Sequence, residues 1–111
     1  MNLTERRKHE RVPMVADLTI EDLGTGQSCS GRSINISRGG VSFFSGKVFP
    51  AGNEIRLTMY LSCDGKSHRV QVHARVVHFS VETRGAIVGA VFDSDLTPAG
   101  QPILCSLIDG K

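Results

Sequence analysis

The sequence predicts an all-β fold, either an antiparallel barrel or a closed sandwich, and three observations lead to this prediction. Six segments show the alternation of apolar and polar side chains that marks half-buried strands. Turn-forming residues, chiefly Gly, Asp, Asn and Pro, separate these segments at short spacing. No segment between them has helical periodicity, so the strands are expected to pair with one another in antiparallel fashion.

The first three predicted strands lie in the N-terminal half of the chain. The first covers residues 14–20 and ends before a glycine-rich turn. The second covers residues 29–36 and is expected to place Ile34 and Ile36 on one face, because side chains two apart share a face. Two glycines interrupt the chain after it, and the third strand resumes at residues 41–44.

The other three predicted strands follow with equally clear turn signals. A long alternating strand at residues 55–61 leads into Asp64-Gly65, a strong signal for a tight hairpin. The returning strand covers residues 70–76. The last strand covers residues 86–92 and contains Gly89, a position where a side chain would be expected to crowd a neighbour.

The two ends of the chain differ from this strand-rich body. Residues 1–12 hold few apolar side chains and are expected to form a mobile arm when unbound. Thr97 and Pro98 suit the cap and first turn of a helix, and apolar residues at helical spacing follow them. A single domain is therefore expected, with an N-terminal arm (1–12), a β-body (13–96) and a C-terminal helix and tail (97–111).

The composition is that of one ordinary globular domain, with 111 residues, 40% hydrophobic and 22% charged. A net charge of +2 is too small to indicate a nucleic-acid-binding protein from bulk electrostatics. The N-terminal segment accounts for this whole excess, because it sets Arg6, Arg7, Lys8 and Arg11 against Glu5 and Glu10.

Cysteine and histidine spacing indicates neither a metal site nor a disulfide framework. Cys29, Cys63 and Cys105 are scattered, without a CxxC pair, and the histidines complete no metal spacing. We therefore expect reduced thiols, no metal and no cofactor. The apolar runs are too short to span a membrane and no signal peptide is visible, so a cytoplasmic protein without membrane insertion is expected.

Two short polar segments contribute nothing to a core. The first, residues 6–11, places Arg7 and Arg11 four positions apart. The second, residues 35–40, offers a side-chain amide, a hydroxyl and two adjacent glycines. Fixed guanidinium groups beside an amide and a hydroxyl suit an anionic ligand that also carries a flat, hydrogen-bonding base. Taken singly, the first segment also reads as a solvated tail and the second as a simple turn.

These segments resemble the two signatures of PilZ domains. Arg7-x-x-x-Arg11 is similar to the RxxxR signature of that family. Asn35-x-Ser37-x-x-Gly40 is similar to its second signature, [D/N]xSxxG. Each motif alone is weak, but both in this order, ahead of a run of strands, are quite specific.

The likeness continues in residues 74–78 and 88–92 and so covers about residues 5–108. It implies a six-stranded antiparallel β-barrel with a short C-terminal helix and a mobile N-terminal arm. It also implies a receptor for cyclic di-GMP, a bacterial second messenger. The expected role is that of an adaptor that passes the signal to a separate, unidentified protein partner.

The resemblance implies that the arm supplies the principal ligand contacts. Arg7 and Arg11 are expected to hold phosphate with their guanidinium forks or to lie flat on a guanine. Arg6 resembles the residue that favours a stacked pair of ligand molecules over a single one. The arm is then expected to pass from disorder to order as it wraps the ligand.

The resemblance implies further contacts from the body. Asn35 would accept a hydrogen bond from guanine, more weakly than the aspartate that the signature also allows, and Ser37 would donate to phosphate. These two side chains are expected to point the same way because they are two apart. Gly39 and Gly40 permit positive φ and would leave backbone N–H groups open to the ligand. His78 is a weaker candidate for stacking on a purine.

A small basic barrel that binds single-stranded nucleic acid is the alternative function. Such barrels usually combine basic residues with exposed aromatic side chains, whereas aromatic residues make up only 5% of this chain. An enzyme is not expected, because no paired carboxylates, nucleophile–base pair or metal set is evident. The downstream partner, the phenotype, the ligand stoichiometry and affinity, and the oligomeric state are left open by the sequence.

Overall fold

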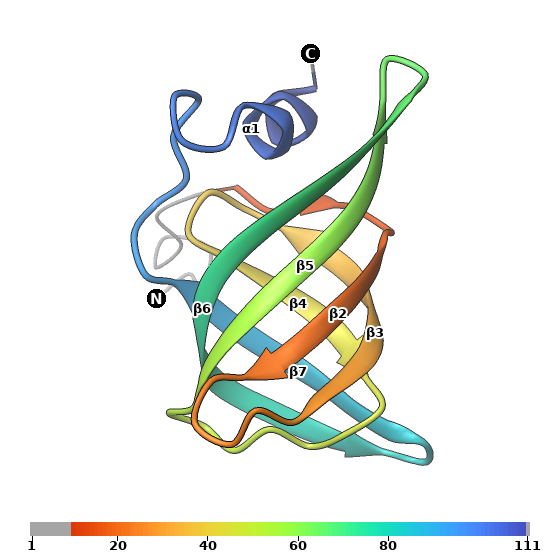
Figure 1. Cartoon of the computed structure of the whole chain (residues 1–111), viewed down its shortest axis with the longest axis vertical. Helices are drawn as coiled ribbons and strands as arrows, with labels where there is room; N and C mark the ends of the chain where they lie inside the picture. Colours follow the sequence, from red (N-terminus) through yellow and green to blue (C-terminus); the bar gives the residue numbers. More distant parts are fainter. Residues whose placement is uncertain (1–9, 111) are drawn as a thin grey trace, which may run out of the picture.

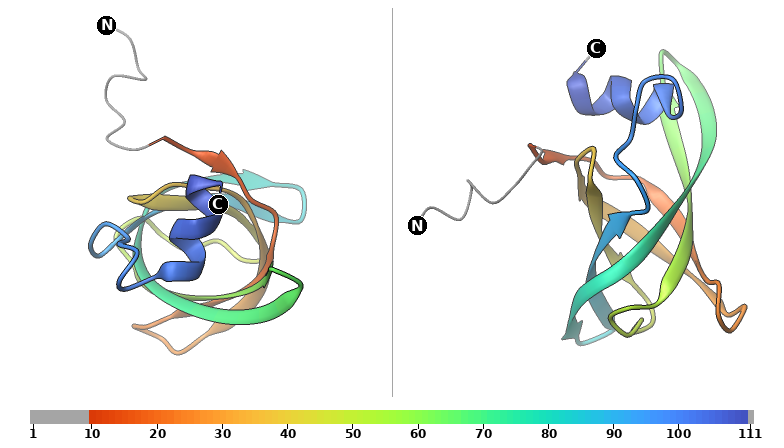
Figure 2. Two further views of the ribbon diagram at one scale, coloured as in Figure 1. Left: turned by 90° about the horizontal axis from the view of Figure 1, so that it is seen from above. Right: turned by 90° about the vertical axis from the view of Figure 1, so that its left-hand side faces the viewer.

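A computed structural model describes residues 10–110 and shows a closed antiparallel barrel (Figure 1). Six strands form its ring in the order β3-β2-β5-β6-β7-β4, and β4 pairs back with β3. The view from above shows this ring directly, with the helix lying across its opening (Figure 2). The predicted six-stranded barrel is therefore confirmed, and the sandwich is excluded.

All six predicted strands are present, and a short additional strand, β1, was not expected. The elements are β1 (Val12–Pro13), β2 (Asp17–Asp22), β3 (Ser28–Ile36), β4 (Gly40–Ser45), β5 (Glu54–Cys63), β6 (Lys66–Glu82), β7 (Gly85–Phe92) and α1 (Pro102–Asp109).

Alternating side chains fill the barrel as the period of the sequence predicts. In β5, Ile55, Leu57 and Met59 are fully buried, while Tyr60 is half exposed on the outer face. Burial of each such aliphatic side chain contributes about 1.5–3 kcal/mol to stability. The tight hairpin after β5 is also confirmed, because Asp64 and Gly65 both have the positive φ angles of a two-residue turn, 53° and 72°.

A β-bulge near the end of β3 determines which side chains face outward there. Ser33 pairs with Phe43 and Asn35 pairs with Ser42, so Ile34 is an extra residue in β3. Ile34 is 39% exposed, whereas Ile36 is fully buried. The expectation that the two isoleucines share a face is wrong, because the bulge shifts the alternation by one residue.

The first strand of the barrel is broken into β1 and β2, and a buried hydroxyl bridges the break. Both pieces pair with β3. Between them, Ser33 Oγ donates a hydrogen bond to the Met14 carbonyl at 2.7 Å and accepts one from the Ala16 N–H at 2.9 Å. Ser33 is 2% exposed, so its hydroxyl satisfies backbone groups that the interrupted ladder would leave unpaired.

Helix α1 closes one end of the barrel (Figure 2). It begins at Pro102, five residues after the expected start, because Thr97 instead closes a turn in which its Oγ1 accepts the Gly100 N–H. Leu104 and Cys105 are its buried residues, and Gly110 caps its C-terminus with a φ of 74°. No helix within residues 10–110 is long and apolar enough to cross a membrane.

Close packing of β3 against β4 predicts that Gly31→Ala destabilises the fold. A Cβ at this position would lie 2.3 Å from the Phe44 carbonyl oxygen and 2.8 Å from Ile20 Cδ1. We expect a loss of about 1–3 kcal/mol in the free energy of unfolding, measured by urea denaturation. Gly46→Ala is the matched control, because its nearest neighbour is 3.8 Å away. An equal loss in both variants would contradict the steric explanation.

Candidate ligand-binding site

Pairing of β1 with β3 brings the end of the basic segment to the second polar segment. Val12 lies opposite Ile36, and Pro13 lies opposite Asn35. Arg11, just before β1, is therefore held beside the end of β3, and its Nη1 donates a hydrogen bond to Asn35 Oδ1 at 3.1 Å. Arg11, the last residue of the first motif, and Asn35, the first residue of the second, are therefore in direct contact.

Asn35 Oδ1 accepts a second hydrogen bond from the neighbouring strand. Ser42 Oγ, directly opposite on β4, donates to it at 3.0 Å. A carbonyl oxygen has two lone pairs, so Arg11 and Ser42 together use its acceptor capacity. For this oxygen to accept from a ligand, one of these two bonds would have to be replaced.

The row of polar positions continues from Ser42 across the next two strands. Ser42 lies opposite Gly89 of β7, and Gly89 lies opposite His78 of β6. The imidazole of His78 lies over Gly89, since a Cβ there would be 2.3 Å from His78 Cε1 and 2.5 Å from Nε2. We refer to Arg11, Asn35, Ser42, Gly89 and His78 as the outer row.

The outer row lies on the outside of the barrel. Directly opposite residues in a sheet share a face, and the sequence neighbours Ile36, Val41 and Val88 are fully buried in the interior. A second bulge, at Val77, adjusts β6 so that His78 falls into this row. The two bulges, one in β3 and one in β6, therefore align the outward residues at the two ends of the row.

Ser37 does not point the same way as Asn35, although the two are two residues apart. Ser37 lies beyond the end of β3 and is 5% exposed, and its Oγ accepts the N–H groups of Gly39 and Gly40, both at 3.2 Å. The Ser37 N–H donates to the Gly40 carbonyl at 2.8 Å. The expected parity fails because Ser37 starts a turn, in which these two glycine N–H groups bond to its hydroxyl.

Neither glycine of this turn is required for an unusual backbone angle, and Gly40 instead permits a close approach. Neither Gly39 nor Gly40 has positive φ, which differs from the expectation. A Cβ at Gly40 would lie 2.5 Å from the Ala90 carbonyl oxygen of β7. Gly40 is therefore needed where β4 begins, because any side chain would push β4 away from β7.

The turn at residues 37–40 is tied to the C-terminal part of the chain. The Arg38 carbonyl accepts the Leu96 N–H at 2.7 Å, and the Gly39 carbonyl accepts the Phe92 N–H at 2.9 Å. The Arg38 guanidinium forms an ion pair with Asp109 of α1 at 2.8 Å. The segment after Asn35 thus contacts both the end of β7 and the last helix.

Cys105 of α1 is not a candidate nucleophile. Burial raises the pKa of its thiol above the ordinary value, while Arg38 lowers that pKa and Asp109 raises it to smaller extents. A thiol with a raised pKa is protonated at neutral pH and therefore unreactive. All three cysteines are free, and no group of three or more potential metal ligands occurs among residues 10–110.

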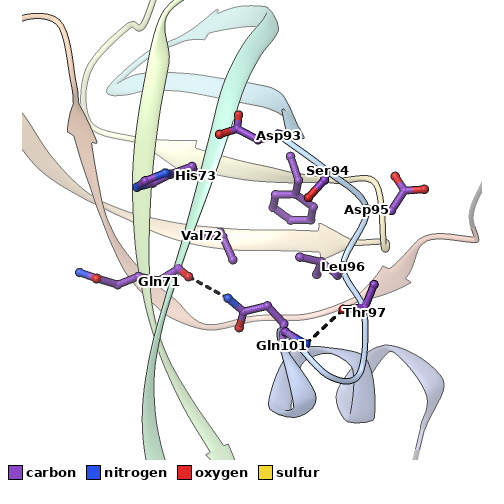
Figure 3. A pocket seen from close by; sticks show the side chains of 11 residues that line it. Gln71, Val72, His73, Asp93, Ser94, Asp95, Leu96, Thr97 and Gln101 are labelled. Atoms are coloured by element: carbon purple, nitrogen blue, oxygen red, sulfur yellow. Dashed lines mark hydrogen bonds between the residues drawn. The ribbon is translucent and has the colours of Figure 1, made fainter.

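A cavity of about 480 Å³ lies away from the outer row, between β6, the segment after β7 and the start of α1 (Figure 3). His73, Asp93 and Asp95 line it together with Gln71. Gln101 crosses it and donates from Nε2 to the Gln71 carbonyl at 2.9 Å. This acidic lining is unsuited to a phosphate-bearing ligand, because like charges would face each other.

The structure brings Arg11 and Asn35 into contact, and it places His78 three strands away along the same outer row. Ser37, Gly39 and Gly40 lie in the adjoining turn. Arg6 and Arg7 lie outside the described residues. Sequence reasoning missed Ser42 and Gly89 as members of the row. Gly89 carried a signal, since it interrupts a strand of β-branched and small apolar residues.

A closed antiparallel barrel with a polar row beside a basic segment defines a small module suited to an anionic ligand. Comparison with family models then identifies it: the PilZ domain model matches residues 5–108. The chain therefore belongs to the PilZ domain family. No curated protein matches the chain.

Solved structures share this fold at low sequence identity. The structure of the Bacillus subtilis inhibitor of motility (MotI/DgrA) matches with a TM-score of 0.74 and 21% identity, over 95% of this chain and 50% of that one. The PilZ domain of YcgR from Escherichia coli, solved with c-di-GMP, matches with a TM-score of 0.69 and 14% identity, over 95% and 90%. The MrkH–c-di-GMP complex of K. pneumonia matches with a TM-score of 0.63 and 13% identity, over 95% and 53%.

The contact between Gly89 and His78 predicts that Gly89→Ala displaces the imidazole without unfolding the barrel. The atoms that a Cβ would meet all belong to the His78 ring, which can rotate away. We expect the His78 ring resonances to shift in NMR spectra while the free energy of unfolding falls by less than about 1 kcal/mol. The rings of His68 and His73 are internal controls. Unchanged His78 resonances would contradict the placement of the ring.

Proposed function

We propose that this protein is a receptor that binds cyclic di-GMP along the outer row and relays the signal to a separate protein partner. Family membership supports the ligand class, as do fold neighbours that are described in complex with c-di-GMP. The observation that carries the proposal is the hydrogen bond from Arg11 to Asn35, which joins the two signature segments at one place. No catalytic step is included in this role.

The chemistry of the row suits a ligand with two phosphates and two guanines. The Arg11 guanidinium can grip a phosphate bidentately or span guanine O6 and N7. It is already next to Asn35, so exchanging that contact for the ligand would release the Asn35 carbonyl to accept from a guanine N–H. The imidazole of His78, which contacts Gly89, supplies a surface for a purine at the other end of the row.

The turn supports the row and offers a further contact. The hydroxyl hydrogen of Ser37 has only a long 3.5 Å contact to the Gly40 carbonyl. Donation of this hydrogen to a phosphate would therefore give up little, although the turn would have to open because Ser37 is 5% exposed. The N–H groups of Gly39 and Gly40 are bonded to Ser37 Oγ, so in this proposal they reach the ligand only when the turn opens.

Ligand binding would also order the arm. Val12 and Pro13 already pair with β3, so in this proposal the residues that become ordered on binding lie N-terminal to Val12. Ordering each further residue costs about 1–2 kcal/mol of backbone entropy. Charge-assisted hydrogen bonds from Arg6, Arg7 and Arg11, at about 1.5–3 kcal/mol each, would offset this cost. The ordered arm would present the new surface that a partner recognises.

Isothermal titration with cyclic di-GMP tests the role of the arginines. Arg7→Ala and Arg11→Ala should each weaken binding by about 10- to 100-fold, because each removes charge-assisted bonds worth roughly 1.5–3 kcal/mol. Arg69→Ala is the matched control, since Arg69 is an exposed arginine opposite Tyr60 near the β5–β6 hairpin. If Arg11→Ala bound as tightly as the control, the proposed site would be wrong.

The same titration reports how many ligands bind. Arg6 precedes the first signature arginine and can place a second guanidinium on another guanine. We expect two molecules of cyclic di-GMP per chain in the wild type and one in Arg6→Ala. A wild-type stoichiometry of one would refute binding of a stacked pair, but it would not contradict the proposed location of the site.

Binding of single-stranded nucleic acid is the competing function. It would show as binding to RNA whose affinity falls steeply with salt, because phosphate contacts release counterions. Filter binding at two salt concentrations separates the two functions. RNA binding without a calorimetric signal for cyclic di-GMP would favour the competing function.

A further inference from the structure

Strand β6 extends past the strand that pairs with it on one side. Its pairing with β5 ends at Arg75, whereas its pairing with β7 continues to Glu82. Val76 is the last residue with partners on the β5 side: its N–H donates to the Asn53 carbonyl at 3.0 Å and its carbonyl accepts the Gly52 N–H at 2.7 Å. Within the described part of the chain, residues 77–82 have no strand on that side (Figure 1).

This open edge is apolar. Val77 is 44% exposed, Phe79 is 39% exposed and Val81 is 67% exposed. Phe79 and Val81 share a face with their opposite residues on β7, Val88 and Ala86, which are fully buried. Exposed strand edges are usually protected by proline, charge or a cover, whereas residues 77–82 contain no proline and carry a single formal charge, on Glu82 at the end of the edge.

The edge is complementary to itself when two copies run antiparallel around Ser80. In that register Phe79 lies opposite Val81 of the other copy, so apolar side chains meet on the inner face. His78 lies opposite Glu82 on the outer face, and its imidazole can reach that carboxylate once it turns away from Gly89. Moving the two-fold position by one residue, to Phe79, would set Glu82 opposite the buried Val76, whose backbone is already bonded to residues 52–53, and would lose the match between His78 and Glu82.

We propose that the partner of this edge is a second copy of the chain, joined by antiparallel pairing of residues 78–82 with Ser80 on the two-fold axis. The backbone groups of Phe79 and Val81 make the new ladder, because alternate residues of a strand direct their N–H and C=O groups to opposite sides. So short a segment gives a small interface. The dimer is therefore weak and concentration-dependent, with a dissociation constant in roughly the micromolar to millimolar range.

A cysteine on the axis tests this geometry directly. Directly opposite Cα atoms in an antiparallel pair are about 4.5 or 5.5 Å apart, and both distances permit a disulfide. Ser80→Cys, in a chain that also carries Cys29→Ser and Cys63→Ser, should oxidise to a covalent dimer on a non-reducing gel. Ser30→Cys in the same background is the control, because Ser30 is also exposed but lies opposite Thr19 in a paired strand.

Sedimentation velocity without cross-linking provides a second, independent measurement. The wild type should show a sedimentation coefficient that rises with concentration, and Val81→Lys should weaken the association at least tenfold. Ile87→Lys is the matched control, since Ile87 is 37% exposed on β7, which is paired on both sides. A wild type that is monomeric at every concentration, with no more cross-linking in Ser80→Cys than in Ser30→Cys, overturns the proposal. The result needs no ligand, so it is independent of the function proposed above.

Discussion

The bulge at Ile34 is the constraint on which the rest of the structure depends. Without it, strict alternation from the buried Ser33 would turn Asn35 into the barrel. With it, Asn35 faces outward opposite Ser42, while Ser33 stays inside and bridges the break between β1 and β2. One extra residue therefore lets Asn35 build one end of the outer row while Ser33 keeps its bridging place inside the barrel.

Much of the fold could be predicted from the sequence because its signals are local. Alternation along residues 55–61 and 70–76 and the Asp64-Gly65 turn each specify their own strands and hairpin. The family could be predicted for a similar reason, since Arg7, Arg11 and the residues after Asn35 occur as short contiguous patterns. The match of the PilZ domain model to residues 5–108 bears this out.

What could not be predicted depends on contacts between distant segments. In the sequence Ile34 and Ile36 are equivalent, and only the register of pairing with β4 distinguishes them. Similarly, β1 forms only because it can pair with the edge of β3. Ser37 is buried because of the turn that it closes, which parity along a strand cannot reveal. The outer row itself requires the order of four strands, so the positions of Ser42 and Gly89 within it follow from topology alone.

The contacts of Arg38 link the turn at residues 37–40 mechanically to the C-terminal segment and helix α1. Its carbonyl is bonded to Leu96, just before the helix, and its guanidinium is bonded to Asp109 within the helix. Arg38, at a variable position within the second signature, therefore acts as a strut between the rim of the barrel and helix α1. A displacement of that rim must either stretch these bonds or move helix α1 with it. A structural change in the outer wall of the barrel can therefore shift the helix without rearranging the buried core.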